Sequence, residues 1–185
     1  MIIVNNLSHS FGEKTLFSNF SFELQNGLYA LVGKSGSGKT TLLRILAGLQ
    51  KANSGEYSID SPISVSFQEN RLFPWYTALK NIEIVSDKNK ARKILCELMM
   101  EDSFNKYPHE LSGGMKRRVS LARALAAPSK TVLLDEPFAG LDEETAEKTL
   151  SVIRNYANER VILISTHNLK IAQKLDGTVS IDPSN

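Results

Sequence analysis

The sequence predicts an α/β fold, in which a central sheet carries an antiparallel β portion near the N terminus and a helical subdomain inserted in the middle. Strand patterns dominate the first third of the chain, helical patterns fill residues 69–127, and strands separated by a helix return afterwards. With 185 residues and 42% hydrophobic content, the chain can form one substantial core. We therefore expect a single domain over 1–185, with an α/β core of about 1–68 and 128–185.

The first third alternates between strand patterns and one helix. The segment "FSNFSFEL" places Phe20, Phe22 and Leu24 on one face of a strand. The continuous apolar run "LYALVG" predicts a buried strand that leads into a glycine-rich loop. The short segments "GEYSID" and "ISVSF" predict two more strands. Between the glycine-rich loop and these two segments, "KTTLLRILAGL" predicts a helix whose apolar stripe consists of Leu42, Ile45, Leu46 and Leu49.

The middle of the chain has the apolar patterns of helices. The segments "TALKNIEIV" and "DKNKARKILCELMM" predict two helices, and the run from Ser112 to Ala127 predicts a third, which Pro128 closes. Ile94, Leu95 and Leu98 form the core stripe of the second helix, so its lysines are expected on a solvated face rather than in a binding patch. Cys96, in the same helix, is expected to be a buried structural thiol.

The last third returns to the α/β pattern. The segments "TVLLD" and "VILIS" predict two strands, which a helix of roughly 142–157 separates. A short strand near "GTVSI" ends the pattern. Together with the first third, this order predicts an α/β body with a helical lobe inserted in its middle.

Composition excludes several classes of protein. The 22 Lys and Arg residues nearly balance 20 Asp and Glu, and no block of like charge indicates binding to nucleic acid or anionic lipid. The single cysteine excludes an internal disulfide and a cysteine-based metal site. The segment "MIIVNNLSHS" lacks the features of a secretion signal, and no apolar run reaches the roughly 18 residues of a membrane span. We expect a cytoplasmic protein.

The segment "GKSGSGKT" at 33–40 matches the complete phosphate-loop pattern GxxxxGK[ST], flanked by a strand and a helix. Glycines allow close backbone approach to a polyphosphate, and N–H groups converge at the helix start. Lys39 is expected to reach the β- and γ-phosphates, and the Thr40 hydroxyl to bind Mg²⁺. The fold core is therefore expected to be that of a P-loop NTPase. The nucleotide-binding residues expected here are Gly33, Lys34, Ser35, Gly36, Ser37, Gly38, Lys39, Thr40 and Thr41.

The segment "TVLLDEP" at 131–137 supplies two acids at the end of a buried strand. Asp135 is expected to hold the magnesium, directly or through water, and Glu136 to polarise an attacking water. A polar turn or a helix cap is the alternative interpretation of this pair. His167 comes just after the next apolar strand, where its imidazole could reach a γ-phosphate, although a lone histidine is more often structural.

A second anion site is indicated by "ELSGGMKRRV" at 110–119. Ser112 can cap a helix, and Gly113 and Gly114 allow an anion to approach the free N–H groups. Met115, Val119, Ala122 and Ala126 would turn the opposite face of the helix inward. One small protein seldom needs two such sites, so the second requires an explanation.

With these motifs in order, the chain resembles the ATP-binding-cassette (ABC) ATPases over nearly its whole length. The phosphate loop, Gln68, "LSGGM", "VLLDEP", "AGLD" and His167 carry the resemblance. It implies that Phe11 stacks on adenine, although Phe11 could equally be a core residue at a strand end. It also implies that Gln68 links the metal site to the helical subdomain and that Asp142 lies in a loop at a dimer interface.

The resemblance also explains the second anion site. Ser112, Gly113 and Gly114 are expected to bind the γ-phosphate of ATP held by a second copy of the chain, in a head-to-tail homodimer with two buried nucleotides. Hydrolysis removes the group that spans the interface, so the pair can separate. Met115 departs from the family signature, which usually ends in glutamine at this position.

The implied function is that of the ATP-hydrolysing subunit of a transporter. "LSGGM" and "FQENRLFPW" are similar to the ATPase subunits of nitrate, sulfonate, taurine and thiamine-precursor importers. The protein is expected at the cytoplasmic face of the inner or plasma membrane. Its expected partners are a transmembrane permease and an external solute-binding protein. Leu72, Phe73 and Trp75 are candidates for the permease contact, with packing inside the helical subdomain as the alternative. A non-transport ABC ATPase of the iron–sulfur assembly or division type is the alternative function.

Overall fold

The computed structural model describes residues 1–181 and contains two sheets. A three-stranded sheet has the order β2-β1-β4, and a five-stranded sheet has the order β5-β6-β7-β3-β8. The first is antiparallel, and every neighbouring pair in the second is parallel. The predicted α/β fold with an antiparallel portion is thereby confirmed.

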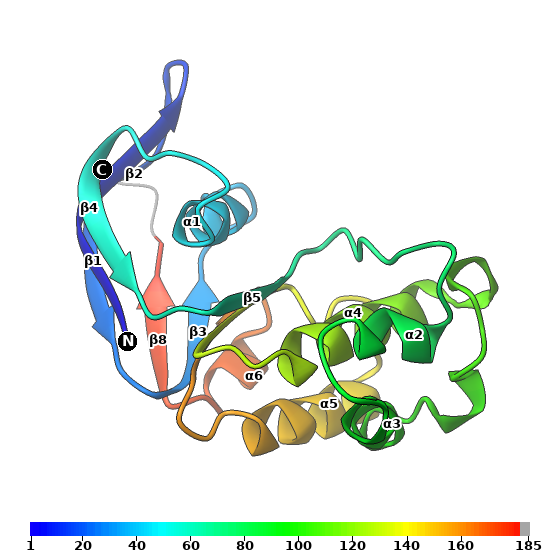
Figure 1. The fold of residues 1–185 in the computed structure, drawn as a ribbon. Coiled ribbons are helices and arrows are strands. Elements are labelled where there is room, and N and C mark those ends of the chain that lie inside the picture. Colours follow the sequence, from blue (N-terminus) through cyan, green and yellow to red (C-terminus); the bar gives the residue numbers. More distant parts are fainter. Residues whose placement is uncertain (182–185) are drawn as a thin grey trace.

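The antiparallel sheet forms one wall of the molecule (Figure 1). It consists of β1 (Ile2–Phe11), β2 (Lys14–Leu24) and β4 (Ser54–Ile59). As the alternation predicts, Leu24 is buried and Phe20 and Phe22 are half-buried on the same side of β2. The sheet therefore turns one face toward the core, which antiparallel sheets commonly do.

The parallel sheet brings the functional motifs together. Its strands are β3 (Gly27–Val32), β5 (Ile63–Ser66), β6 (Thr131–Asp135), β7 (Val161–Ser165) and β8 (Gly177–Ser180). Every residue of β6 and β7 is buried, which explains their continuous apolar sequences. Because the strands run in one direction, the segments that follow β3, β5, β6 and β7 all lie at the same edge of the sheet.

Helices cover both faces of the parallel sheet. The helix α1 (Lys39–Leu46) lies between the two sheets, where its leucines share a core cluster with Ile2, Leu31 and Leu133. The helix α5 (Glu143–Asn155) shares the other cluster with alternate residues of β6 and β7. A short helix, α6 (Leu169–Ala172), precedes β8.

Three further helices gather on one side of the molecule (Figure 1). They are α2 (Ala78–Glu83), α3 (Lys88–Glu97) and α4 (Gly113–Ala126), and they pack against one another. Two 3₁₀ turns, Glu101–Ser103 and Pro108–Glu110, connect α3 to α4. Within residues 1–181, none of the helices combines the length and the apolar character that crossing a membrane requires.

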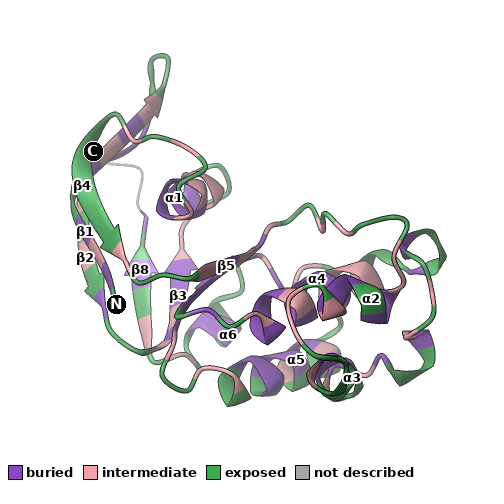
Figure 2. Cartoon of the chain, in the orientation of Figure 1, coloured by how far each residue is buried: buried purple, intermediate pink, exposed green. Residues whose placement is uncertain are grey.

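Two burial predictions are wrong. Leu49 is 62% exposed because α1 has already ended. The N–H groups of Gly48 and Leu49 turn back to Ile45 O and Arg44 O, both at 2.9 Å, and thereby close the helix. Cys96 is exposed on α3, although Ile94, Leu95 and Leu98 are fully buried as predicted. Figure 2 shows both buried and exposed segments along the helices on this side of the molecule. The thiol faces solvent because the apolar stripe occupies the other side of the helix.

Candidate nucleotide-binding site

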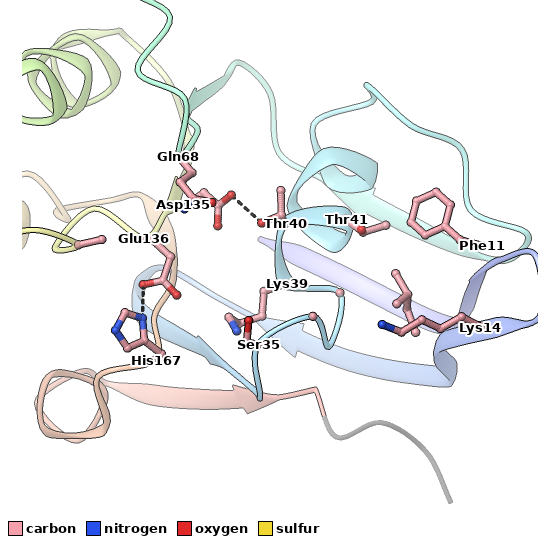
Figure 3. A pocket seen from close by; sticks show the side chains of 14 residues that line it. Phe11, Lys14, Ser35, Lys39, Thr40, Thr41, Gln68, Asp135, Glu136 and His167 are labelled. Atoms are coloured by element: carbon pink, nitrogen blue, oxygen red, sulfur yellow. Dashed lines mark hydrogen bonds and ion pairs between the residues drawn. The ribbon is translucent and has the colours of Figure 1, made fainter. Parts of the chain in front are cut away.

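A cavity of about 550 Å³ opens where the strand ends of the parallel sheet meet the antiparallel sheet. Side chains from both sheets and from the intervening loops line it (Figure 3). Its lining residues are Phe11, Lys14, Leu16, Ser35, Gly36, Gly38, Lys39, Thr40, Thr41, Gln68, Asp135, Glu136, Ala139 and His167. Most of the residues predicted for ATP and magnesium therefore share one cavity.

The phosphate loop joins β3 to α1, and it is tightly packed at Gly33. A Cβ added to Gly33 would lie 2.5 Å from Ile181 O and 2.5 Å from Ser37 Oγ, so no larger residue fits there. Gly33, Lys34 and Ser37 do not line the cavity, whereas the rest of the predicted loop does. The first N–H groups of α1 have no acceptor within the helix, so the loop and helix start offer donors to an anion.

Lys39 brings a positive charge to the loop. Its side chain is 9% exposed, and its ammonium donates hydrogen bonds to Gly33 O at 2.8 Å and to Lys34 O at 3.2 Å. Two backbone carbonyls thus hold the charge beside the cavity. An ammonium in this position can bind a phosphate oxygen by a charge-assisted hydrogen bond.

Thr40 and Asp135 meet across the cavity. The Thr40 hydroxyl donates to Asp135 Oδ2 at 2.8 Å, and the Ser165 hydroxyl donates to Asp135 Oδ1 at 2.5 Å. Asp135 is only 3% exposed at the end of β6. Gln68, which follows β5, lies beside this pair in Figure 3. A hydroxyl, a carboxylate and an amide oxygen are the ligand types that Mg²⁺ prefers, so this group of side chains fits the ion.

Glu136 and His167 form the catalytic candidates. A carboxylate oxygen of Glu136 lies 2.9 Å from Nδ1 of His167, and both side chains line the cavity. Glu136 has a φ of 49°, a conformation that non-glycine residues seldom adopt. Its N–H donates to the hydroxyl of Ser165 at 2.9 Å and to the carbonyl of Ser165 at 3.1 Å. A carboxylate fixed in this way can act as a general base.

The β1–β2 hairpin supplies two residues at the other end of the cavity. Phe11 is 56% exposed, and its ring meets that of His9 edge to face at 4.9 Å, so it is not a core residue. Lys14, which the sequence analysis missed, points its ammonium toward the phosphate loop (Figure 3). An added Cβ at Gly36 would lie 3.7 Å from Lys14 Nζ. The one sequence signal for a role of Lys14 at the site was its position, three residues after Phe11.

The second predicted anion site lies outside this cavity. None of Ser112, Gly113 and Gly114 is among the lining residues. The Ser112 hydroxyl accepts a hydrogen bond from Met115 N at 3.3 Å and so caps α4. A Cβ added to Gly113 would meet no atom within 4 Å, so Gly113 faces open space, whereas one added to Gly114 would lie 3.5 Å from Leu141 Cδ2. Val119, Ala122 and Ala126 are buried as predicted, and Met115 is half-buried.

Asp142 also lies outside the cavity, as the cap of α5. Its carboxylate accepts hydrogen bonds from the Thr145 N–H at 2.9 Å and from the Thr145 hydroxyl at 2.8 Å. The backbone hydrogen bond from Thr145 is the main reason that the pKa of Asp142 lies below its usual value. Asp142 thus caps α5, and it is not among the residues that line the cavity.

An aromatic patch follows Gln68 on the helical side. Phe73, Trp75 and Tyr76 form it, with ring centroids 5.7–6.3 Å apart. Trp75 is 66% exposed, so packing inside the helical subdomain does not account for it, and Phe73 is 38% exposed. The fully buried Asn81, which the sequence analysis also missed, holds the segment: its side chain donates to the carbonyls of Phe73, Tyr76 and Thr77 and accepts from the Phe73 N–H.

Comparisons with known proteins show which family the chain resembles. The family model described as "ABC transporter" matches residues 17–139. An aliphatic sulfonates import ATP-binding protein of Corynebacterium glutamicum is 38% identical over 91% of this chain and 74% of its own. An L-cystine import ATP-binding protein of Bacillus subtilis is 36% identical over 98% of this chain and 87% of its own.

Solved structures show the same fold. A dimeric post-hydrolysis state of the ATP-binding cassette MJ0796, bound to ADP and Pi, superposes with a TM-score of 0.89 at 26% identity and covers 99% of this chain and 95% of that one. A second dimeric structure of MJ0796 superposes with a TM-score of 0.86 at 28% identity, covering 98% and 94% of the two chains. The chain therefore belongs to the ABC transporter family, as an ATPase subunit that binds ATP and hydrolyses it to drive transport.

Proposed function

We propose that this ATPase works as a head-to-tail pair in which each nucleotide is held by two copies of the chain. The observation that carries the proposal is the division of the predicted residues. The phosphate loop, Asp135, Glu136 and His167 belong to one site, whereas Ser112, Gly113 and Gly114 lie outside the cavity, with Ser112 and Gly113 exposed to solvent. A two-fold pair would place the second segment against the partner's cavity, and would do so twice.

Within each cavity, the phosphate loop and Lys39 bind the phosphates and Phe11 stacks on the base. Thr40, Asp135 and Gln68 are the residues that would hold Mg²⁺, which supplies charge neutralisation on the phosphates when it is bound. Glu136 accepts a proton from the attacking water. His167, whose Nδ1 lies 2.9 Å from the Glu136 carboxylate, orients that carboxylate beside the γ-phosphate.

Replacement of Glu136 by glutamine tests both the role of Glu136 as the base and the ATP-dependent pairing. Glu136→Gln keeps the size of the side chain and removes the base, so we expect ATP binding to persist and turnover to fall by about 10²- to 10⁴-fold. Light scattering should then detect a dimer with ATP and a monomer with ADP. The exposed Glu56 on β4 provides the control substitution, Glu56→Gln. Normal turnover would exclude Glu136 as the base, and a monomer with ATP would contradict the pairing.

The second part of the proposal concerns transport. The import names of the relatives and the similarity of "FQENRLFPW" support a bacterial importer of a small solute, of the sulfonate, nitrate or thiamine-precursor type. The subunit would dock on a transmembrane permease at the cytoplasmic face of the membrane and would receive solute through an external binding protein. In this arrangement residues 69–127 form the helical subdomain that carries the contact, and 1–68 and 128–185 form the ATPase core.

Phe73 and Trp75, the two exposed residues of the aromatic patch, form the proposed permease contact. Replacing both by alanine should leave ATP binding intact and uncouple ATP hydrolysis from solute uptake by the assembled transporter. Tyr57→Ala, which removes an aromatic ring exposed on β4, is the matched control. Uptake at the normal rate by the double variant would remove the patch from the interface.

A further inference from the structure

Arg117 connects three segments of the molecule that are far apart in the sequence. It lies one turn inside α4, and its guanidinium donates to Glu136 O at 3.1 Å, to Ala139 O at 3.0 Å and to Gln68 O at 3.1 Å. All three acceptors are backbone carbonyls next to the side chains that line the cavity. One planar cation thus fixes the chain after β5 and the chain after β6 to the same helix.

The contact with Glu136 matters most because that residue has a strained backbone. A non-glycine residue at φ 49° costs free energy and persists only where its surroundings hold it. The Glu136 N–H is held by Ser165, and the Glu136 carbonyl is held by Arg117 and by the Ala139 N–H at 3.2 Å. Without Arg117 the carbonyl side loses its charged donor. The direction of the carboxylate, and its contact with His167, would then be less well defined.

We propose that Arg117 is a positioning residue for ATP hydrolysis, which acts through Glu136 and keeps it in register with the Ser112–Gly114 segment at the start of the same helix. The inference rests on the proposed role of Glu136 as the base. Arg117 binds no nucleotide in this view. It ensures that the carboxylate is correctly oriented when the N terminus of α4 is correctly placed, so its loss should lower the rate more than the affinity.

The next residue of the helix provides a matched control. The Arg118 guanidinium donates to Leu98 O at 2.9 Å and to Met99 O at 3.2 Å, so it too binds the backbone of another segment. These carbonyls belong to the end of α3 rather than to the cavity. Arg117 and Arg118 therefore share a helix, a functional group and a type of contact, and they differ in the segment that they hold.

The test compares Arg117→Met, Arg117→Lys and Arg118→Met. Methionine keeps the apolar stem and removes the donors. We expect Arg117→Met to lower kcat by about tenfold or more, with the Kd of a fluorescent ATP analogue changed by less than about twofold. Lysine cannot reproduce the planar fork and should restore kcat only in part. Arg118→Met should lower the melting temperature while kcat stays within about twofold of the wild type.

A double variant separates this inference from the proposal on which it rests. If Arg117 acts through Glu136, Glu136→Gln combined with Arg117→Met should be no slower than Glu136→Gln alone in single-turnover assays. A slow Glu136→Gln with a normal Arg117→Met would overturn only the inference. The inference would also be overturned if Arg118→Met lost as much kcat as Arg117→Met. An additive loss of rate in the double variant would overturn it too. A normal rate for Glu136→Gln would instead refute the role of Glu136.

Discussion

Lys39 shows how much of the site depends on a single charge. Its ammonium is nearly buried and is held by two loop carbonyls beside the cavity. Lys39→Ala removes the charge-assisted contact to a phosphate, which is worth about 1.5–3 kcal/mol, so the Kd for ATP should rise by roughly ten- to a hundredfold. Calorimetric titration with ATP measures this, and the exposed Lys51→Ala is the control. Wild-type affinity in Lys39→Ala would contradict the assignment.

At the level of single residues, the sequence predicts the contacts that lie within one motif. The phosphate loop and the pair Asp135 and Glu136 are recognisable because their spacing along the chain is itself the chemical requirement. Ser165 and Arg117 carry no such pattern. They hold Asp135 and Glu136 from positions that only the folded chain brings near, so their role required the structure.

The error at Cys96 has a different cause. The average burial of cysteine was given more weight than the position of the residue on its helix. Leu95 and Leu98 define the buried face of α3, and Cys96 is turned away from it. The helical periodicity predicts that Cys96 is exposed, whereas the usual burial of cysteine does not.

Among the elements, α5 allows a test of its cap. The pKa of Asp142 is lowered, first of all by the hydrogen bond from the Thr145 N–H. A lowered pKa in the folded state means that the cap stabilises the protein above the unfolded pKa of about 4, and that this stability is lost as the pH falls through the folded pKa. The melting temperature of the wild type should therefore fall more between about pH 5 and 3 than that of Asp142→Asn.

The control for this experiment is another exposed carboxylate, Asp102, outside α5. Asp102→Asn should leave the pH dependence of the melting temperature as it is in the wild type. If Asp142→Asn also melts with unchanged pH dependence, the charged cap contributes nothing to the stability of α5, and the lowered pKa has no consequence for folding.

A sustained apolar pattern identifies the longer elements that the sequence predicted. The parallel strands β6 and β7 and the helices α3, α4 and α5 all match their apolar patterns. In β1 the alternation is broken, because the pairing shifts between Val4 and Leu7 and Asn6 has a φ of 50°. The helix α6 has four residues, which is too few for a period, and only its cap, Asn168, marks it.

For the whole molecule, the main question is which surfaces meet. One chain places Phe11, Lys39 and Glu136 in a single cavity and leaves Ser112 and Gly113 facing open space elsewhere. Motif order along the sequence is the same whether such residues meet within one chain or between two. The distinction therefore depends on the folded geometry, and a solution experiment on mixtures of variants can test it directly.

Two inactive variants should restore each other if the site is shared. Gly113→Val should fold, because an added Cβ there meets no atom within 4 Å, yet it blocks the approach of the partner's phosphate. Lys39→Ala disables the other half of the site. In a mixed pair, both defects meet in one site and the second site is intact. Random pairing makes about half of the pairs mixed, so an equal mixture should recover about a quarter of the wild-type ATPase rate.

The control for this mixture follows from the geometry of the cavity. Lys39 and Glu136 line the same cavity of the same chain, so each pair formed from Lys39→Ala and Glu136→Gln carries one defect in each of its sites, and this mixture should stay inactive. Recovery there would mean that Lys39 and Glu136 serve different nucleotides. If instead Lys39→Ala and Gly113→Val fail to restore each other while each folds and the wild type dimerises with ATP, Gly113 does not face the nucleotide of a partner.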